Sequence, residues 1–485
     1  MNPQLRSKYE VVIGIECHVQ LATKTKLFCG CDNDAREAEP NTKVCEVCFG
    51  MPGTLPVLNK RAVELALRLG LALNAEYPAD YHTKFDRKNY FYPDSPKGYQ
   101  ITQFDEPIVP KGYIEFPVDG KMTRIGITRA HLEGDAGKLT HPEGANYSLV
   151  DLNRAETPLV EIVSEPDMRS AAEAKGYAQE LYNIVRYAEV SNANLYYGNM
   201  RFDINVSVRL VGAKEFGTRT ETKNLNSFKA IERTVEYETR RQIVMLEGGG
   251  KIRQETRGWN DAKGETYPMR SKEDADEYRY FPEPDLPPLI ITEKMVEEAR
   301  SQVGVRPSEL RNILEEMKIP QLEAEVMVAE PSLALFWKNV VTTSPSSARF
   351  ALNWLIGDQV KLAETNVTTI LESEITPDRL VEVAELVSQG QLSSTNAKAL
   401  LAIMWSDSAS VESIAKEKGL LQQSDEGELK AVVASVIEAN PQAVADYRSG
   451  NERAFGALVG QAMKATQGKG NPPLINKLLK EALEA

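Results

Sequence analysis

Four of the five cysteines in this 485-residue chain lie within one 20-residue window. They form a Cys-x-Cys pair and a Cys-x-x-Cys pair with thirteen residues between them, namely Cys29, Cys31, Cys45 and Cys48. Two such pairs joined by a loop can converge on one tetrahedral Zn²⁺ ion as four thiolates. We therefore predict a structural zinc site that braces this loop, because four thiolates leave no coordination position open for a substrate.

Two disulfide bonds would account for the same four cysteines. However, the sequence shows no secretory signal peptide, and thiols stay reduced inside the cell. We therefore favour zinc and expect a cytoplasmic protein. The fifth cysteine, Cys17, stands apart on the apolar side of a predicted strand and is interpreted as a small core residue.

The composition is that of an ordinary globular protein, with 42% hydrophobic and 26% charged residues. No apolar run approaches the roughly 20 residues that would span a bilayer, so we expect no membrane segment. A net charge of −13 argues against a general coat for nucleic acid. Residues 451–485 differ, with five basic and three acidic side chains. A polyanion would therefore bind to local basic patches.

The spacing of apolar residues changes along the chain. Up to about residue 290, short alternating apolar runs broken by Gly, Pro, Asn and Asp predict strands, with helices interspersed at 60–75 and 171–188. The proline-rich segment 282–289 ends this region, and beyond it the apolar residues repeat with helical spacing. A polar stretch at 406–410 divides the helical part. We predict an α+β domain over 1–290, an all-α domain over 291–407 and an all-α tail over 408–485.

The segment 11–21 alternates between apolar and polar residues and predicts a strand. Its apolar positions, such as Ile13 and Cys17, point to one face, and Glu16 and His18 point to the other. A glutamate and a histidine on one strand face can bind a metal or shuttle a proton. A solvated face of a sheet is the alternative.

Further carboxylates occur on other predicted strands. Asp203 lies on the polar face of an alternating segment, Glu161 lies inside an apolar run, and Glu133 precedes a turn together with His131 and Asp135. Several carboxylates from separate strands are what Mg²⁺ requires, since it prefers oxygen ligands. A surface salt bridge is the alternative for each one taken singly.

Basic residues accompany two of these segments. Lys84, Arg87 and Lys88 lie in a short aromatic-rich stretch, and Lys223 lies two residues from Glu221 on a predicted strand. Such cations can hold a triphosphate or a tRNA backbone, whereas an exposed basic turn over packed tyrosines is the alternative.

Some motifs are absent from the sequence. It has no GxxxxGK[ST] motif, no GxGxxG motif that opens a helix after a strand, and no GxSxG motif. Any use of ATP would therefore depend on a metal bound by carboxylates. Cys17 is misplaced for a thiol glutaminase, so if nitrogen is transferred, another chain must release it.

Seven segments between residue 9 and the C-terminus, taken together, resemble the B subunit of the tRNA-dependent aspartyl/glutamyl amidotransferase. They are IGIECHVQL, KFDRKNYFYPD, ITRAHLEGDAGK, TPLVEIVSEPD, TETKNLNSF, YRYFPEPDLPPL and AFGALVGQAMKATQGKGNP. One position departs from the family pattern: members commonly have a second acidic residue directly after the one that matches Glu133, and here that residue is Gly134.

The resemblance implies a catalytic cradle with an antiparallel sheet that is similar to the glutamine synthetase fold, then a helical domain and a YqeY-like tail. It also implies a carbon–nitrogen ligase that uses ATP, Mg²⁺ and structural Zn²⁺. The B subunit would phosphorylate the side-chain carboxylate of Glu-tRNA(Gln), Asp-tRNA(Asn) or both. It would then amidate that group with ammonia from the A subunit, in a heterotrimer with A and C subunits.

The resemblance further implies roles for individual residues. Those around the Mg²⁺ and phosphorylation site would be Glu16, His18, Glu133, Glu161 and Asp203, of which all but Glu16 are expected to bind the metal. The residues expected to face the phosphates of ATP are Lys84, Arg87, Lys88 and Lys223. Lys464 and Lys469 would contact the tRNA backbone, and the alternative for them is an ordinary surface of a terminal helix.

Two other interpretations can be compared with this one. A non-catalytic, zinc-containing tRNA-binding scaffold would keep the cysteines and the terminal lysines, but it would not need acids on three strand faces. The archaeal glutamate-specific relative of this subunit carries an additional domain before the helical region. Here the boundary at Pro288 leads directly into helical sequence, which leaves no room for such a domain.

Overall fold

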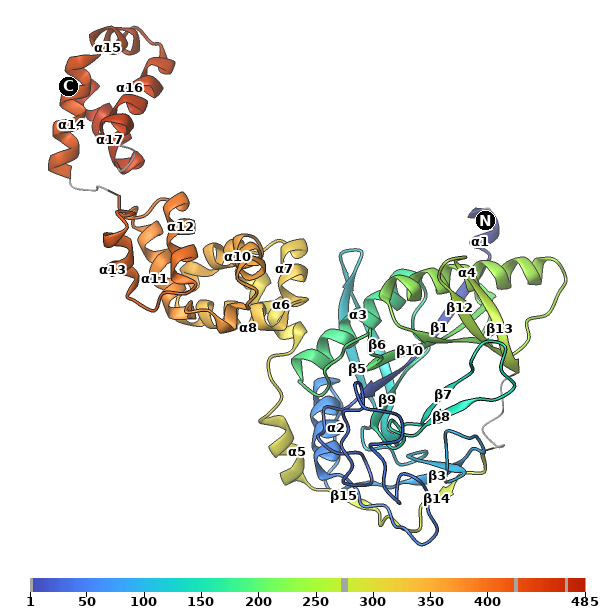
Figure 1. Cartoon of the computed structure of the whole chain (residues 1–485). Coiled ribbons are helices and arrows are strands. Elements are labelled where there is room, and N and C mark those ends of the chain that lie inside the picture. The colour runs from blue at the N-terminus through green and yellow to red at the C-terminus, as the bar shows by residue number, and fades with distance from the viewer. Residues whose placement is uncertain (1–2, 272–277, 423–425, 467–469, 485) are drawn as a thin grey trace. The chain divides into compact units, whose positions relative to one another are not determined.

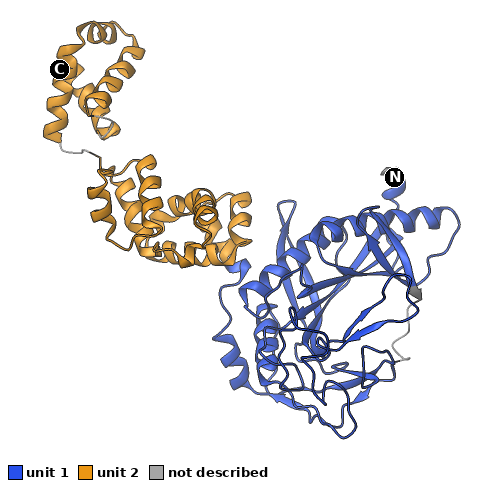
Figure 2. Ribbon diagram, in the orientation of Figure 1, with its two compact units in different colours: residues 1–309 blue, residues 310–485 orange. Residues whose placement is uncertain are grey.

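The computed structural model describes residues 3–271, 278–422, 426–466 and 470–484 (Figure 1). The chain divides into two compact units, residues 1–309 and 310–485 (Figure 2). The first unit contains both strands and helices, and the described part of the second consists of helices.

An eight-stranded sheet forms the centre of the first unit, in the order β13-β12-β11-β10-β1-β9-β6-β5. Its strands are β1 (Tyr9–Gln20), β5 (Gly112–Val118), β6 (Lys121–Gly134), β9 (Pro158–Ser164), β10 (Met200–Leu210), β11 (Thr220–Leu225), β12 (Glu255–Asn260) and β13 (Glu265–Ser271). Every neighbouring pair is antiparallel except β11 and β12, which are parallel. The predicted α+β class with a largely antiparallel sheet is confirmed.

Helices cover the apolar face of this sheet. The helices of the first unit are α1 (Pro3–Arg6), α2 (Lys60–Ala72), α3 (Ala171–Tyr187), α4 (Phe228–Glu247) and α5 (Glu293–Arg300). Figure 1 shows α3 and α4 side by side along the sheet, where α3 contacts β5 and α4 contacts β10. Ile13 and Cys17 of β1 are fully buried beneath them, as the alternation predicted. The predicted helices at 60–75 and 171–188 are confirmed.

Three small sheets complete the first unit. They pair β2 (Tyr81–Thr83) with β15 (Leu289–Ile291), β3 (Asp86–Asn89) with both β4 (Tyr99–Thr102) and β14 (Phe281–Pro282), and β7 (Lys138–Thr140) with β8 (Leu149–Asp151). After β15, α5 contacts α2, and its residue Ala299 belongs to the same core as the sheet. The first unit therefore extends beyond residue 290, because the chain still buries apolar side chains in the first core after that point.

The second unit consists of short helices. They are α6 (Pro307–Glu316), which begins in the first unit, α7 (Gln321–Val328), α8 (Pro331–Thr343), α9 (Ala348–Leu355), α10 (Asp358–Asn366), α11 (Pro377–Ser388), α12 (Ser394–Met404), α13 (Val411–Glu417), α14 (Glu426–Ala439), α15 (Pro441–Arg448), α16 (Glu452–Ala465) and α17 (Pro472–Glu484), with 3-10 helices at Pro345–Ser347 and Ile370–Glu372. Helices α14 to α17 share a core that includes Leu429, Leu458 and Leu479. Helix α13 contacts α11 and α12, so it belongs with the helices before it.

Within the described ranges, no helix combines the length and the apolar character that crossing a lipid bilayer requires.

Candidate active site

The polar face of the sheet gathers acidic and basic side chains from three adjacent strands. β9 lies between β1 and β6, and the register sets Glu161 of β9 opposite His18 of β1 on one side and opposite His131 of β6 on the other. Directly opposed side chains on neighbouring strands have Cβ atoms about 4.5–5.5 Å apart. Strand pairing therefore assembles a centre from residues that are far apart in the sequence.

Two histidines and two glutamates form this centre. His18 Nε2 lies 3.5 Å from Glu133 Oε1 and 3.5 Å from Glu161 Oε2. His131 Nε2 lies 3.3 Å from Glu161 Oε2 and 3.7 Å from Glu133 Oε2. The structure thus brings together three residues that the sequence singled out on separate strands. It adds His131, which the sequence showed beside Glu133 without assigning it a role.

Each of these groups changes the pKa of the others. Burial alone would lower the pKa of His18, but hydrogen bonding and attraction from Glu161, with attraction from Glu133, outweigh burial and raise it to about 9. Burial would raise the pKa of Glu161, but the two histidines hold it well below its usual range. The histidines also lower the pKa of the buried Glu133. Both glutamates are therefore ionised at neutral pH, although Glu133 is buried and Glu161 is partly buried.

This centre has the donor atoms for a divalent cation. One ligand atom each from His18, Glu133 and Glu161 lies within 4.8 Å of the others. Two ionised carboxylates fit a hard cation such as Mg²⁺, which keeps several water ligands and binds one or two carboxylates. His18 would have to lose its proton to serve as a third ligand. Nδ1 of His131 is buried without a hydrogen-bond partner. These residues could therefore hold the metal that the sequence predicted.

Asp203 also lines the first pocket described below, but its carboxylate is paired with Lys223 and not with the histidines. It is buried on β10, where Lys223 Nζ lies 2.8 Å from its Oδ2 and the Asn224 amide donates to its Oδ1 at 2.9 Å. The pairing of β10 with β11 is irregular between Phe202 and Ile204, next to this residue. Asp203 thus pairs with Lys223 and is not in the group of converging ligand atoms, so the metal-binding role that the resemblance implies for it stays a prediction.

Two pockets adjoin the His–Glu centre. Their volumes are about 280 Å³ for the first pocket and about 290 Å³ for the second. Both are lined by His18, Lys88, Glu161, Lys223 and Tyr278. Residues of the centre therefore face two separate spaces.

The two pockets differ in their other linings. The first adds Glu133, Asp135, Glu156, Arg201 and Asp203, with Lys97. The second adds Glu16, whose Oε1 accepts a hydrogen bond from Asn205 at 3.0 Å. It also adds three basic residues that were not among the predicted site residues, namely Arg129, His131 and Arg219. Arg219 directly precedes β11, four residues before Lys223.

Of the three cations predicted from residues 84–88, only Lys88 reaches the pockets. Arg87 points the other way, since adjacent residues of a strand face opposite sides, and it forms two bonds of 2.7 and 2.8 Å to the fully buried Glu283. Lys84 is paired with Asp105 at 3.0 Å. Arg87 and Lys84 are not among the described residues that line either pocket, so their expected contact with phosphates lacks a geometric basis.

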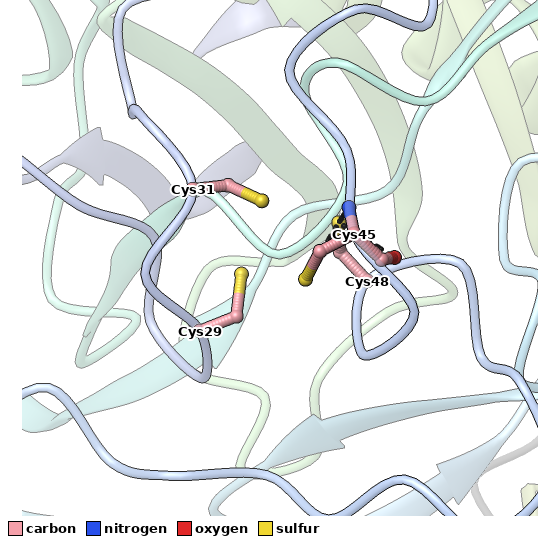
Figure 3. A group of neighbouring side chains, drawn as sticks. All are labelled: Cys29, Cys31, Cys45 and Cys48. Atoms are coloured by element: carbon pink, nitrogen blue, oxygen red, sulfur yellow. Dashed lines mark hydrogen bonds between the residues drawn. The ribbon is translucent and has the colours of Figure 1, made fainter.

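The four clustered cysteines converge, although no disulfide joins them. Their four sulfur atoms all lie within 4.8 Å of one another. Figure 3 shows the Cys29–Cys31 pair facing the Cys45–Cys48 pair across a short gap. The ammonium of Lys26, which is fully buried, lies 3.6 Å from the Cys48 sulfur. Four sulfurs at this separation fit a tetrahedral zinc ion.

The predicted tRNA contacts lie in the second unit. Lys464 is exposed in the last turn of α16. Lys469 lies outside the described residues.

The structure thus combines a mixed α/β domain that carries a carboxylate–histidine centre with a helical region that follows it in the chain. The sequence matches the GatB/GatE catalytic domain over residues 11–297 and the GatB domain over residues 335–483. The chain therefore belongs to the family formed by the B subunits of aspartyl/glutamyl-tRNA(Asn/Gln) amidotransferases.

Curated relatives match almost the whole chain. The B subunit of the aspartyl/glutamyl-tRNA(Asn/Gln) amidotransferase from Caldanaerobacter subterraneus is 50% identical over 477 residues, which cover 98% of this chain and 99% of the relative. The proteins of the same name from Thermoanaerobacter sp. and Carboxydothermus hydrogenoformans are 49% and 47% identical, with the same shares covered.

Proposed function

We propose that this chain is the activating and amidating subunit of a tRNA-dependent amidotransferase. It would use ATP to phosphorylate the side-chain carboxylate of Glu-tRNA(Gln), Asp-tRNA(Asn) or both, and then replace the phosphate with ammonia. The observation that carries this proposal is the centre formed by His18, Glu133 and Glu161, which adjoins two pockets. The subunit would work in the cytoplasm with an A subunit that releases ammonia and with a C subunit.

The second pocket suits ATP. Arg129, Arg219 and Lys223 line it with positive charge, which triphosphates require. The rings of Phe104 and Tyr280 stack there with centroids 4.2 Å apart, and Phe104 is half-exposed. These rings offer an apolar surface for a purine, so the pocket supplies complementary walls for both ends of the nucleotide.

The first pocket would then receive the aminoacyl end of the tRNA. Because both pockets are lined by His18 and Glu161, the carboxylate and the γ-phosphoryl group would approach one another at the centre. Holding two reactants in this way makes the transfer effectively unimolecular.

The chemistry explains why ATP is needed. A carboxylate reacts poorly with ammonia because its leaving group would be oxide. An oxygen of the carboxylate would attack the γ-phosphorus with release of ADP, giving an acyl phosphate. Ammonia would then attack the carbonyl carbon with loss of a proton, and inorganic phosphate would leave. Lys88 and Lys223 would balance the charge on the transferred group.

A magnesium ion held by His18, Glu133 and Glu161 would supply further neutralisation of phosphate charge. Zn²⁺ would bind the four cysteines and brace their loop. Lys464 and Lys469 would contact the tRNA backbone, where such contacts position the nucleic acid without reading its sequence.

ADP release by the chain assembled with A and C subunits tests the proposal. The mixture would contain Mg²⁺, ATP and ammonium, with Glu-tRNA(Gln), Asp-tRNA(Asn) or uncharged tRNA added in turn. We expect release only with a mischarged tRNA, and a loss of about 100-fold or more in Glu161→Gln, since Glu161 would hold the metal that neutralises charge on the transferred phosphoryl group. Glu265→Gln on β13 is the matched control, because Glu265 is half-exposed on the same sheet and is not among the pocket residues.

The alternative function is a zinc-containing tRNA-binding scaffold without catalysis. The absence of ADP release that depends on a mischarged tRNA would favour the scaffold. Dependent release that survives Glu161→Gln would instead exclude the proposed role of Glu161.

A further inference from the structure

Glu156 occupies an unusual position at the first pocket. It precedes β9 with a backbone φ of 65°, in the left-handed region that glutamate seldom adopts. Its side chain is only 10% exposed, yet the residue is among those that line the pocket. A strained, buried and charged residue needs a reason in the surrounding structure.

The carboxylate of Glu156 lies where a side chain of residue 134 would begin. A Cβ atom added to Gly134 would stand 2.3 Å from Glu156 Oε2 and 3.1 Å from Cδ. Any larger residue at position 134 would therefore collide with this carboxylate. Gly134 directly follows Glu133 of the His–Glu centre.

The other oxygen of Glu156 has a clear partner. Oε1 accepts a hydrogen bond from Lys97 Nζ at 2.7 Å, and the Lys97 side chain is 9% exposed. Oε2 is buried without a partner, against Gly134. The other lysine or arginine side chains at the first pocket include Arg201, which is paired with Asp135, and Lys223, which is paired with Asp203. Glu156 thus holds a separate ammonium at the pocket wall.

We propose that Glu156 is a positioning residue of the first pocket, and that Gly134 provides the space in which its carboxylate holds the Lys97 ammonium where the aminoacyl end binds. Positions 134 and 156 then share one volume that accommodates one acidic side chain. The inference rests on the proposed function for the role of the pocket, while the linkage between the two positions rests on geometry alone.

Glu156→Gln tests the positioning role in the assembled enzyme, because it keeps the shape and removes the charge. The bond between the Glu156 carboxylate and the Lys97 ammonium is charge-assisted, and the neutral amide of glutamine would accept a weaker one. We therefore expect kcat/KM for the mischarged tRNA to fall about 10- to 100-fold, while KM for ATP stays within about twofold, since ATP binds in the other pocket. A lower melting temperature with unchanged kcat/KM would show a purely structural role and overturn the proposal.

A double variant tests the shared volume. Gly134→Glu alone introduces a collision, and Glu156→Gly alone leaves Lys97 without its partner, so both should lower the melting temperature or kcat/KM. In the combination, the new side chain at position 134 enters the space that Glu156 vacates. We expect the double variant to exceed Gly134→Glu in melting temperature and to exceed both single variants in kcat/KM. Additive losses would refute the linkage.

Glu189 offers a matched control. It also has a positive φ, 51°, and is paired with Arg68 at 3.2 Å, but its side chain is 75% exposed and it is not among the described residues that line the pocket. Glu189→Gly should therefore leave kcat/KM unchanged. Melting temperatures report the linkage even if the wild-type complex shows no tRNA-dependent ADP release, so failure of the proposed function and failure of the linkage remain distinguishable.

Discussion

His18 and His131 contact the same oxygen of Glu161, with their Nε2 atoms 3.5 and 3.3 Å from Oε2. The two histidines come from β1 and β6, the strands on either side of β9. One carboxylate is thus held from both sides, and its orientation depends on both rings.

This arrangement predicts that His131 orients the carboxylates that we propose as metal ligands. Losing an outer partner of a metal ligand typically costs 10- to 100-fold in affinity. We expect His131→Gln to raise the Mg²⁺ concentration for half-maximal ADP release by about that factor. His141→Gln should have no effect, because His141 is exposed near the β7–β8 pair. Equal Mg²⁺ dependence in both variants would exclude the orienting role.

Substitution of Arg87 should lower the stability of the protein, whereas substitution of Lys88 should lower its activity. Arg87→Met leaves the buried carboxylate of Glu283 without its partner, which typically destabilises a protein by about 3–5 kcal/mol. Lys88→Met removes a cation from both pockets and should lower the rate of ADP release with little change in stability. Denaturant unfolding and ADP assays on both variants check this prediction. A stable Arg87→Met with impaired ATP use would instead support the phosphate contact expected from the sequence.

The buried Glu238 predicts a dependence of stability on pH. Burial alone would raise its pKa, but hydrogen bonds and attraction from Arg241, with hydrogen bonds from Thr266 and Thr220, lower it below 4.5. The carboxylate therefore contributes stability that is fully present above pH 4.5 and is lost as the pH falls through the folded-state pKa.

Glu238→Gln measures this contribution. At pH 7 the variant should be less stable than the wild type, by up to about 3–5 kcal/mol. The difference in melting temperature should shrink between pH 5 and 3, because the wild type loses its advantage there. A difference that stays constant over this range would rule out Glu238 as the cause.

The cysteine cluster predicts one zinc ion per chain. Cys45→Ser should abolish stoichiometric zinc measured by mass spectrometry of the purified protein, and the loop at 29–48 should become more sensitive to protease. Cys17→Ala is the control and should keep the metal, because Cys17 is a residue of β1 that is buried in the core of the first unit. Full zinc content in Cys45→Ser would mean that the cluster does not hold the ion.

Local patterns predicted some parts of the fold well. The period of two in β1 correctly separated Cys17 from His18, since alternation depends only on neighbouring residues. Helix α4 was not predicted, because polar residues such as Thr234, Glu238 and Gln242 occupy its buried face and interrupt the apolar stripe. Its signal was Ser227, whose side chain accepts a hydrogen bond from the Ala230 amide at the helix start.

The contacts at the site could not be predicted, because they join residues that are far apart in the sequence. The sequence marked Glu133 and Glu161, but only the strand order decides that β9 lies between β1 and β6. Likewise, no residue near Arg87 in the sequence indicates that its partner is Glu283. The sequence therefore predicted a phosphate contact for a cation that is paired with a buried carboxylate. Residue type and spacing suggested the chemistry, whereas the contacts depended on topology.

The place of β1 in the sheet has a consequence during synthesis on the ribosome. Both of its partners, β9 and β10, lie much later in the chain, at Pro158–Ser164 and Met200–Leu210. At roughly 5–20 residues per second, the nascent strand stays unpaired for on the order of ten seconds. Its apolar residues are open to wrong partners during that time, so the emerging first unit is expected to be a client of ribosome-associated chaperones.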